Sequence, residues 1–143
     1  MSNEVFQYAH RVTYADCTIG NHVYYGRYLG ILEAARGEFF RKVGGTFLQW
    51  QQAGLIFPVI ECRLAYKAPA NYDDVLTVTL WLTRLERVRL SFAYHLLDQN
   101  RVMIVEAETH HICASIEDKP RRLPESLVAN LKPYLAIPLA VSS

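Results

Sequence analysis

The sequence predicts an α+β fold in two layers, in which one long helix packs against a long antiparallel sheet. Apolar side chains recur at helical spacing over about residues 23–43, and from residue 60 onward they alternate with polar ones as in half-buried strands. The chain has 143 residues, 51% of them hydrophobic, which suits one compact domain with its own core. We therefore expect residues 1–143 to form a single domain.

The first expected element is a strand over residues 5–13, where apolar and polar side chains alternate loosely. The strand delivers Asp16 to a turn at Gly20-Asn21, because Gly and Asn both favour turn conformations. The expected helix follows this turn directly.

We expect the long helix to begin at Asn21 and to end at Gly44-Gly45, a pair typical of a glycine cap at a helix C-terminus. Its apolar positions share one face at 3.6-residue spacing: Tyr25, Tyr28, Leu29, Leu32, Phe39, Phe40 and Val43. A looser helix or a loop is expected over residues 46–54.

The second half of the chain has the period of two that is typical of strands. The expected strands cover residues 60–67, 76–83, 88–96 and 102–115. A hairpin turn at residues 98–100 joins the last two strands. The segment from Pro124 to Tyr134 is expected to add a short helix, with Pro124 near its first turn.

The composition argues against several kinds of partner. With 15 Lys and Arg residues against 14 Asp and Glu, the chain has no broad basic field, so nucleic acid is not an expected partner. The first ten residues lack a basic region followed by an apolar stretch, and no window reaches the roughly 18 apolar residues of a membrane span. We therefore expect a cytoplasmic protein. Cys17, Cys62 and Cys113 are too far apart to indicate a disulfide framework or a zinc site.

The strongest functional signal is the junction of turn and helix. The first backbone N–H groups of a helix have no intrahelical partner, so they can hold an oxyanion. Around these donors we expect four catalytic groups, which together suffice to polarise a carbonyl and deliver water to it: the carboxylate of Asp16, the hydroxyls of Thr18 and Tyr25, and the imidazole of His22.

Each of these interpretations has a simpler alternative. The Asp16 carboxylate would instead only accept hydrogen bonds from the amides of its turn. His22 would instead have a surface or capping role, since the positive end of a helix disfavours its cationic form.

Three glycines on one flank of the helix, Gly26, Gly30 and Gly37, indicate that something approaches its backbone closely. Each glycine costs roughly 1 kcal/mol relative to alanine inside a helix. A neighbouring helix across a subunit interface is the favoured explanation, and a bound substrate arm is the alternative, which would make the nearby Glu33 a substrate-binding residue. Glu33 is also spaced to form an ion pair with Arg36, which lies in the apolar face.

Arginines cluster about one strand junction, at Arg84, Arg87 and Arg89, with a second basic group at Arg121-Arg122. Such residues often form a solvated face only. The alternative is a phosphate clamp, because the guanidinium fork matches phosphate oxygens. No metal site is expected, because the strand histidines lack a ligand arrangement: His95, His110 and His111.

The chain resembles the hotdog-fold acyl-CoA thioesterases of the 4-hydroxybenzoyl-CoA thioesterase and YbgC type over nearly its whole length. The resemblance rests on VTYADCTIGNHVYYGRYL at 12–29 followed by LEAAR, on YKAPANYDDVLTV at 66–78, and on KPRRLP at 119–124. It implies a long helix wrapped by an antiparallel sheet, and edge-to-edge pairing into homodimers or homotetramers with sites at the dimer interface. It also implies no cofactor other than the CoA thioester substrate, and it puts Arg87 and Arg89 where relatives bind the CoA phosphates.

The segment between the first strand and the helix, which holds Asp16 to Tyr25 and which we call the mouth region, departs from the family pattern at one position. Relatives usually have Asp-x-Asp there, and the second carboxylate is the nucleophile or general base, but this chain has Thr18. Asp16 matches the first Asp of the pair, and His22 matches the histidine of the Gly-His-Val-Asn-Asn variant, which takes part in catalysis in acyl-carrier-protein thioesterases. Tyr25 falls where relatives have Tyr or His, and its backbone amide is the implied oxyanion donor.

Three functions remain open at this point. The first is an acyl-CoA thioesterase, in which Asp16 and His22 direct a water molecule to a thioester carbonyl. The second is a non-hydrolytic module that binds acyl-CoA or acyl-carrier protein. The third is a hotdog hydratase or dehydratase. The tyrosines near the mouth suit either an aryl or a fatty acyl group: Tyr14, Tyr24, Tyr25 and Tyr28.

Overall fold

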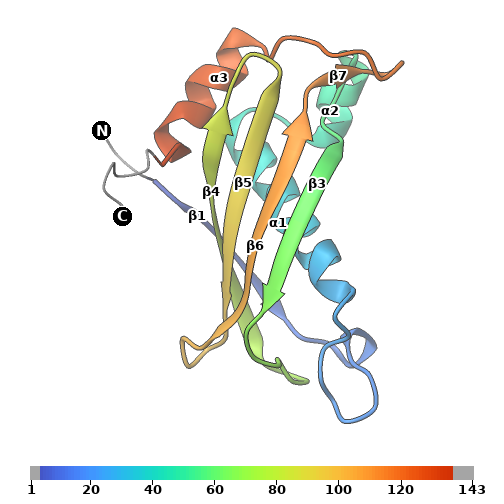
Figure 1. The fold of residues 1–143 in the computed structure, drawn as a ribbon, viewed down its shortest axis with the longest axis vertical. Helices are drawn as coiled ribbons and strands as arrows, with labels where there is room; N and C mark the ends of the chain where they lie inside the picture. Colours follow the sequence, from blue (N-terminus) through green and yellow to red (C-terminus); the bar gives the residue numbers. More distant parts are fainter. Residues whose placement is uncertain (1–3, 137–143) are drawn as a thin grey trace.

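A five-stranded antiparallel sheet covers one side of the long helix α1 (Arg27–Val43) in the computed structural model, which describes residues 4–136 (Figure 1). The strand order is β1-β4-β5-β6-β3, and the strands are β1 (Phe6–Arg11), β3 (Val59–Tyr66), β4 (Val75–Leu85), β5 (Arg89–Leu97) and β6 (Met103–Ile112). This arrangement confirms the predicted α+β hotdog architecture. The expected domain also included residues 1–3 and 137–143, which lie outside the described residues.

The shorter elements close the ends of the sheet. They are η1 (Tyr14–Asp16), α2 (Phe47–Gln52), β2 (Leu55–Ile56), β7 (Ala114–Ser115), α3 (Glu125–Leu131) and η2 (Lys132–Tyr134). The predicted helices near residues 46–54 and 124–134 are confirmed as α2 and α3. The Thr46 hydroxyl accepts a hydrogen bond from the Gln49 backbone N–H, and the Gln49 side chain returns one to Thr46, a capping box that starts α2.

The helix start was predicted wrongly. α1 begins at Arg27, six residues after the expected Asn21. Gly20 and Asn21 both have positive φ angles, +97° and +66°, so the backbone there is a left-handed turn that cannot belong to an α-helix. The C-terminal end agrees with the prediction, because the N–H groups of Gly44 and Gly45 both donate to the Phe40 carbonyl.

The core lies between α1 and the inner face of the sheet. Alternate residues of β4 are fully buried, namely Leu76, Val78, Leu80 and Leu82, and they meet an aromatic cluster around Phe39 and Phe40 of α1. Two residues assigned to the apolar helix face are instead exposed: Tyr25 precedes the helix and is 61% exposed, and Leu29 is 46% exposed. The helix therefore has two surfaces, one in the core and one turned outward.

The strand β3 forms one edge of the sheet and is exposed along most of its length. Val59, Ile60 and Tyr66 on this edge are each between 44% and 50% exposed. Unpaired backbone groups beside apolar side chains make such an edge a template for pairing with another chain. All three cysteines are free thiols, and Cys62 on β3 is exposed.

The two ends of the sheet carry different polar groups. The loop between β1 and α1 lies at one end, because Arg11 pairs with Val75 at the start of β4. The β4–β5 hairpin lies at the other end, beside α3 (Figure 1). The eleven residues of β4 span roughly 33 Å between these ends at the usual rise per residue.

Candidate active site

Residues 17–26 form the mouth, a tight loop between η1 and α1. The Thr18 N–H donates to the His22 carbonyl over 2.9 Å, and the Asn21 N–H donates to the Thr18 carbonyl over 3.0 Å. The loop is joined to the segment after β3 by two further hydrogen bonds, from the Val23 N–H to the Ala70 carbonyl and from the Tyr72 N–H to the Asn21 carbonyl. Hydrogen bonds to a distant segment of the chain thus keep these residues in a loop, where a helix was expected.

Free backbone donors lie at the end of the mouth, although not where the sequence put the helix start. The Tyr24 N–H donates to the Asp16 carbonyl and the Arg27 N–H donates to the Tyr24 carbonyl. Between them, the N–H groups of Tyr25 and Gly26 donate to no acceptor within residues 4–136. These two amides precede the first turn of α1, where the helix dipole favours negative charge.

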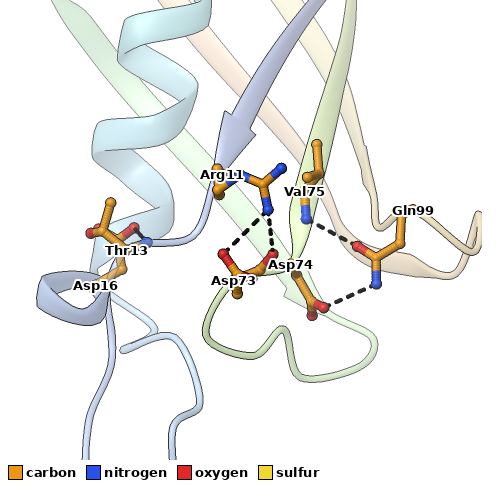
Figure 2. Close-up of polar contacts among 7 residues, drawn as sticks. All are labelled: Arg11, Thr13, Asp16, Asp73, Asp74, Val75 and Gln99. Atoms are coloured by element: carbon orange, nitrogen blue, oxygen red, sulfur yellow. Dashed lines mark hydrogen bonds and ion pairs between the residues drawn. The ribbon is translucent and has the colours of Figure 1, made fainter.

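Asp16 is only 6% exposed, and its carboxylate already has several partners. Oδ2 accepts a hydrogen bond from the Thr13 backbone N–H at 2.9 Å (Figure 2). Oδ2 also accepts one from His10 Nε2 at 2.8 Å, while Oδ1 lies 3.3 Å from Arg27 Nε. Burial raises the pKa of Asp16, but the hydrogen bonds from Thr13 and His10 outweigh it, so the pKa lies below its ordinary value of 3.8. The carboxylate is therefore ionised and held within its own turn.

His22 and Thr18 are both exposed in the mouth. The His22 ring is held by one contact, between Nδ1 and the side-chain oxygen of Asn71 at 2.7 Å. The Thr18 hydroxyl lies 3.4 Å from the His22 carbonyl. Neither side chain is among the partners of the Asp16 carboxylate. Three of the four expected catalytic residues lie in the mouth and Asp16 lies in η1 directly before it, and the four therefore do not form one hydrogen-bonded cluster.

Exposed aromatic rings surround the mouth. Tyr24 and Tyr25 have ring centroids 4.8 Å apart, and Tyr66 from β3 packs edge-on against Tyr25 at 6.1 Å. Tyr14 packs edge-on against Tyr72 at 5.9 Å. Three of the four tyrosines expected near the mouth are thus exposed there, and the fourth, Tyr28, is buried against Tyr66.

The predicted Glu33–Arg36 ion pair is absent from the described residues. Arg36 is buried, and its Nη1 donates to the Tyr94 hydroxyl at 3.1 Å instead. Glu33 is exposed one turn earlier on α1. Both residues line a cavity of about 380 Å³ whose other walls are mainly apolar, with Phe47, Ile56, Phe57, Pro58 and Val59 among them.

The glycine flank proves to be partly open. Gly26 caps α1 and is not in its interior, and a Cβ there would lie 2.8 Å from the Tyr24 ring. A Cβ at Gly30 would meet no atom within 4 Å. Gly26 and Gly30 line a groove of about 300 Å³ between α1 and β1, together with His10 and Asp16.

The arginines lie at the other end of the sheet from the mouth. Arg87 and Arg89 are exposed at the β4–β5 hairpin, and Arg84 forms a 3.5 Å ion pair with Glu86. Arg87 also borders a cleft of about 480 Å³ with Arg122 and residues of α3. Within one chain, these arginines and the mouth do not come together.

Residues 12–131 match the model of the Thioesterase-like superfamily. The chain belongs to this superfamily. Among its relatives is the acyl-CoA thioester hydrolase YbgC of Escherichia coli O6:H1, 30% identical over 133 residues that cover 92% of this chain and 99% of that protein. The 1,4-dihydroxy-2-naphthoyl-CoA hydrolase of Thermosynechococcus vestitus is 28% identical and covers 87% of each chain. A probable thioesterase from Bartonella henselae has a similar structure, with a TM-score of 0.79, 30% identity and coverage of 85% of this chain and all of its own.

Membership of the thioesterase-like superfamily confirms the family predicted from the three sequence motifs at 12–29, 66–78 and 119–124. The described residues contain no group of three or more metal-ligating side chains and no helix long and apolar enough to cross a membrane. His95 and His110 each lie 3.5 Å from a glutamate, Glu106 and Glu108 respectively.

Two residues near the mouth of this superfamily member were missed by sequence reasoning. His10 lies on β1 six residues before Asp16, and the alternating burial of β1 turns it inward toward that carboxylate. Asn71 lies 49 residues from His22, so only the fold brings the two side chains together. A polar residue at an inward position of β1 was a usable signal for His10, whereas no local pattern pointed to Asn71.

Proposed function

We propose that this chain is an acyl-CoA thioesterase, which hydrolyses a thioester to a free acid and the CoA thiol without a cofactor. The proposal is supported by its superfamily and by relatives that are named as acyl-CoA thioester hydrolases. The single observation that carries it is the pair of N–H groups at Tyr25 and Gly26 that have no acceptor among residues 4–136, in the same loop as the exposed imidazole of His22. We also propose that the enzyme acts in the cytoplasm.

The proposed reaction begins when water attacks the thioester carbonyl carbon. As the C–O bond forms, His22 takes a proton from the water, Thr18 orients that water, and the carbonyl electron pair moves onto oxygen. The N–H of Tyr25 stabilises the resulting oxyanion. The tetrahedral intermediate then collapses, the C–S bond breaks, and the leaving thiolate receives the proton from the His22 imidazolium.

Asp16 supports this site as an ionised anchor. Its carboxylate binds His10, the Thr13 N–H and Arg27, and its backbone carbonyl binds the Tyr24 N–H. These contacts join β1, η1 and the start of α1, so they fix the position of the Tyr25 amide. We propose that this anchoring, and not direct attack on the thioester, is the contribution of Asp16 to catalysis.

The substrate is proposed to lie across two copies of the chain. The mouth and the arginines Arg84, Arg87 and Arg89 occupy opposite ends of a sheet roughly 33 Å long. Antiparallel pairing of two β3 edges about a two-fold axis brings the mouth of one copy to the hairpin end of the other. The partner then supplies the arginines for the CoA phosphates, and the cavity beside Glu33 accommodates the acyl group.

A second candidate function is supported by Thr18. A neutral hydroxyl cannot activate water without a base, so a chain with Thr18 in place of a carboxylate would suit a module that binds acyl-CoA or acyl-carrier protein without hydrolysis. His22 is the one feature that separates the two functions, because a binding module has no use for a proton acceptor there.

Hydrolysis of a panel of aryl and fatty acyl-CoAs, followed by release of free thiol, tests the proposal. We expect turnover, a fall in kcat of roughly 100-fold or more in His22→Ala, and a smaller fall in Asp16→Asn. Tight binding of acyl-CoA with no thiol release by the wild type would favour the binding module. A kcat that falls further in Asp16→Asn than in His22→Ala would instead make Asp16 the base.

A further inference from the structure

The contact between His22 and Asn71 assigns a role to an asparagine outside the mouth loop. We infer that Asn71 is a positioning residue that selects the protonation form of His22 and thereby makes its Nε2 the proton acceptor. This inference rests on the proposed function of His22 and extends it to the segment between β3 and β4. The His22–Asn71 contact is present in the protein without a bound substrate.

The chemistry follows from which atoms face each other. The Asn71 side-chain oxygen lies 2.7 Å from His22 Nδ1, and a carbonyl oxygen can only accept a hydrogen bond. Nδ1 must therefore carry the proton, which leaves the lone pair of the neutral ring on Nε2. Nε2 has no partner among the described residues, and the ring is exposed, so this nitrogen is accessible to water and substrate.

The backbone on both sides keeps this contact in register. His22 and Asn71 are paired as an isolated antiparallel bridge, with flanking hydrogen bonds from the Val23 N–H to the Ala70 carbonyl and from the Tyr72 N–H to the Asn21 carbonyl. Two segments 49 residues apart in the chain are thus fixed side by side at the base of the ring. The ring orientation follows from the fold and needs no bound ligand.

A polar network holds Asn71 from the other side. The Asn71 N–H donates to Asp74 Oδ2 at 2.8 Å. Asp74 Oδ1 accepts a hydrogen bond from Gln99 Nε2 at 3.0 Å (Figure 2). The Gln99 side-chain oxygen in turn accepts the Val75 N–H at 2.9 Å. The β5–β6 turn therefore supports the asparagine that orients the histidine.

The carboxylates near this contact are already engaged. Asp74 binds Asn71 and Gln99, Asp73 pairs with Arg11 at 3.2 Å (Figure 2), and Asp16 pairs with His10 and Arg27. None of these carboxylates contacts the His22 ring. An amide oxygen orients the ring without adding a negative charge, so the imidazolium formed during catalysis can release its proton to the leaving thiolate.

The wild-type protein provides the first test. Nitrogen NMR of the imidazole side chains, with His22→Gln to assign the signal, distinguishes a ring protonated at Nδ1 from one protonated at Nε2. We expect the neutral His22 ring to carry its proton on Nδ1. A neutral ring that carries its proton on Nε2 would overturn the inference, whatever the activity of the enzyme.

Variants provide the second test. Asn71→Ala should lower kcat roughly 10-fold or more with little change in KM, and the His22 ring should then populate both protonation forms. Asn71→Asp keeps an acceptor at the same place, so it should restore most of the activity, with the acid side of the pH–rate profile moved to higher pH because a carboxylate favours the imidazolium. Asn100→Ala, an exposed asparagine whose side chain has no hydrogen bond in the described residues, is the matched control.

The outcomes separate the inference from the proposed function. Unchanged kcat in Asn71→Ala, with His22→Ala inactive, overturns the positioning role and leaves the thioesterase proposal intact. Unchanged kcat in His22→Ala overturns the proposed mechanism and the inference together. A loss of kcat in Asn71→Asp equal to that in Asn71→Ala, with both variants folded, also contradicts the inference, because the acceptor would then have no effect.

Discussion

A buried arginine sets the direction of a chain of hydrogen bonds through the core. Arg36 donates to the Tyr94 oxygen, so the Tyr94 hydroxyl donates to Thr109, the Thr109 hydroxyl donates to His111 Nε2, and His111 Nδ1 donates to the Phe57 carbonyl. Every polar group along this chain is satisfied only when His111 is neutral. Burial and the nearby Arg36 charge lower the pKa of His111 to about 4, which agrees with that requirement.

The stability of the protein should therefore decrease in mild acid. The unfolded chain takes up a proton on His111 near pH 6.5, whereas the folded chain does so near pH 4, so the stabilisation is complete above 6.5 and falls as the pH drops between these values. We expect a loss of about 3 kcal/mol in the free energy of unfolding across this interval. Urea denaturation at several pH values measures it.

His111→Gln should flatten this pH dependence, and His95→Gln, on the partly exposed outer side of β5, should leave it unchanged. An equally steep decrease in His111→Gln would assign the effect to other groups. Asp16 does not contribute to this decrease. Its pKa is lowered in the folded protein, so the stabilisation that its carboxylate provides is lost only below its ordinary pKa value of 3.8.

At the residue scale, the sequence predicted which polar residues lie at the candidate site but not which residues they contact. Thr18, His22 and Tyr25 do share the mouth loop, and Asp16 lies in η1 directly before it, since the four are close in the chain. Their roles depend on contacts with β1 and with the segment after β3, and these contacts join residues that no local pattern relates. The same limit explains the error at Arg36, whose expected partner was three residues away and whose actual partner, Tyr94, is on β5.

At the scale of elements, α1 shows where periodicity misleads. Tyr25 continues the helical spacing of apolar residues, but it precedes the helix, because residues 21–23 form hydrogen bonds with residues 70–72 instead of with one another. Tertiary contacts thus replaced the first turn of the expected helix. The strands were predicted to within a few residues, since their alternation reflects a sheet with one buried face. The two-residue strand β2 was not predicted, and the strand expected over residues 102–115 is divided into β6 and β7, which belong to different sheets.

The outward surface of α1 provides a test at this scale. Gly30 lies in the helix with open space beside it, so Gly30→Ala should raise the free energy of unfolding by about 0.5–1 kcal/mol and leave activity intact. Gly30→Leu projects further into the groove and should weaken either self-association or kcat/KM. Chemical denaturation, sedimentation and thiol release measure the three effects.

Gly54→Ala is the contrasting variant. An added Cβ at Gly54 would also meet no atom within 4 Å, but the φ of +93° strains any side chain there, so the substitution should destabilise the protein without any steric clash. If Gly30→Leu keeps both the mass and the activity of the wild type, the groove beside Gly30 is neither an interface nor a substrate channel.

At the scale of the whole molecule, the distance between mouth and arginines leads to a complementation experiment. His22→Ala removes the proton acceptor, and Arg87→Ala with Arg89→Ala removes the proposed phosphate contacts, so each variant alone should hydrolyse acyl-CoA poorly. If one subunit supplies the mouth and its partner the arginines, coexpressed variants should recover about a quarter of the wild-type activity through mixed dimers. Thiol release from the purified mixture measures the recovery.

A short pantetheine thioester, which lacks the nucleotide phosphates, is the control substrate. The arginine variant should hydrolyse it as well as the wild type does. Equal losses on both substrates would mean that the arginines support the fold, and a monomer of 16.4 kDa that hydrolyses thioesters at micromolar concentration would exclude a shared site.

The difference between the two edges of the sheet determines how far such assembly can proceed. If β3 pairs with β3 of another copy, each copy consumes the same surface that it offers, so the contact ends with two chains. Growth into a filament would need β1 to pair as well, but β1 is six residues long beside an eleven-residue β4. Leu82, two residues beyond the last residue of β4 that pairs with β1, is bridged by Leu135. The outward residues of β1 include Gln7 and Arg11, which do not favour stacking. If only β3 pairs with another copy, self-association therefore ends at a closed pair of chains and does not extend into a filament.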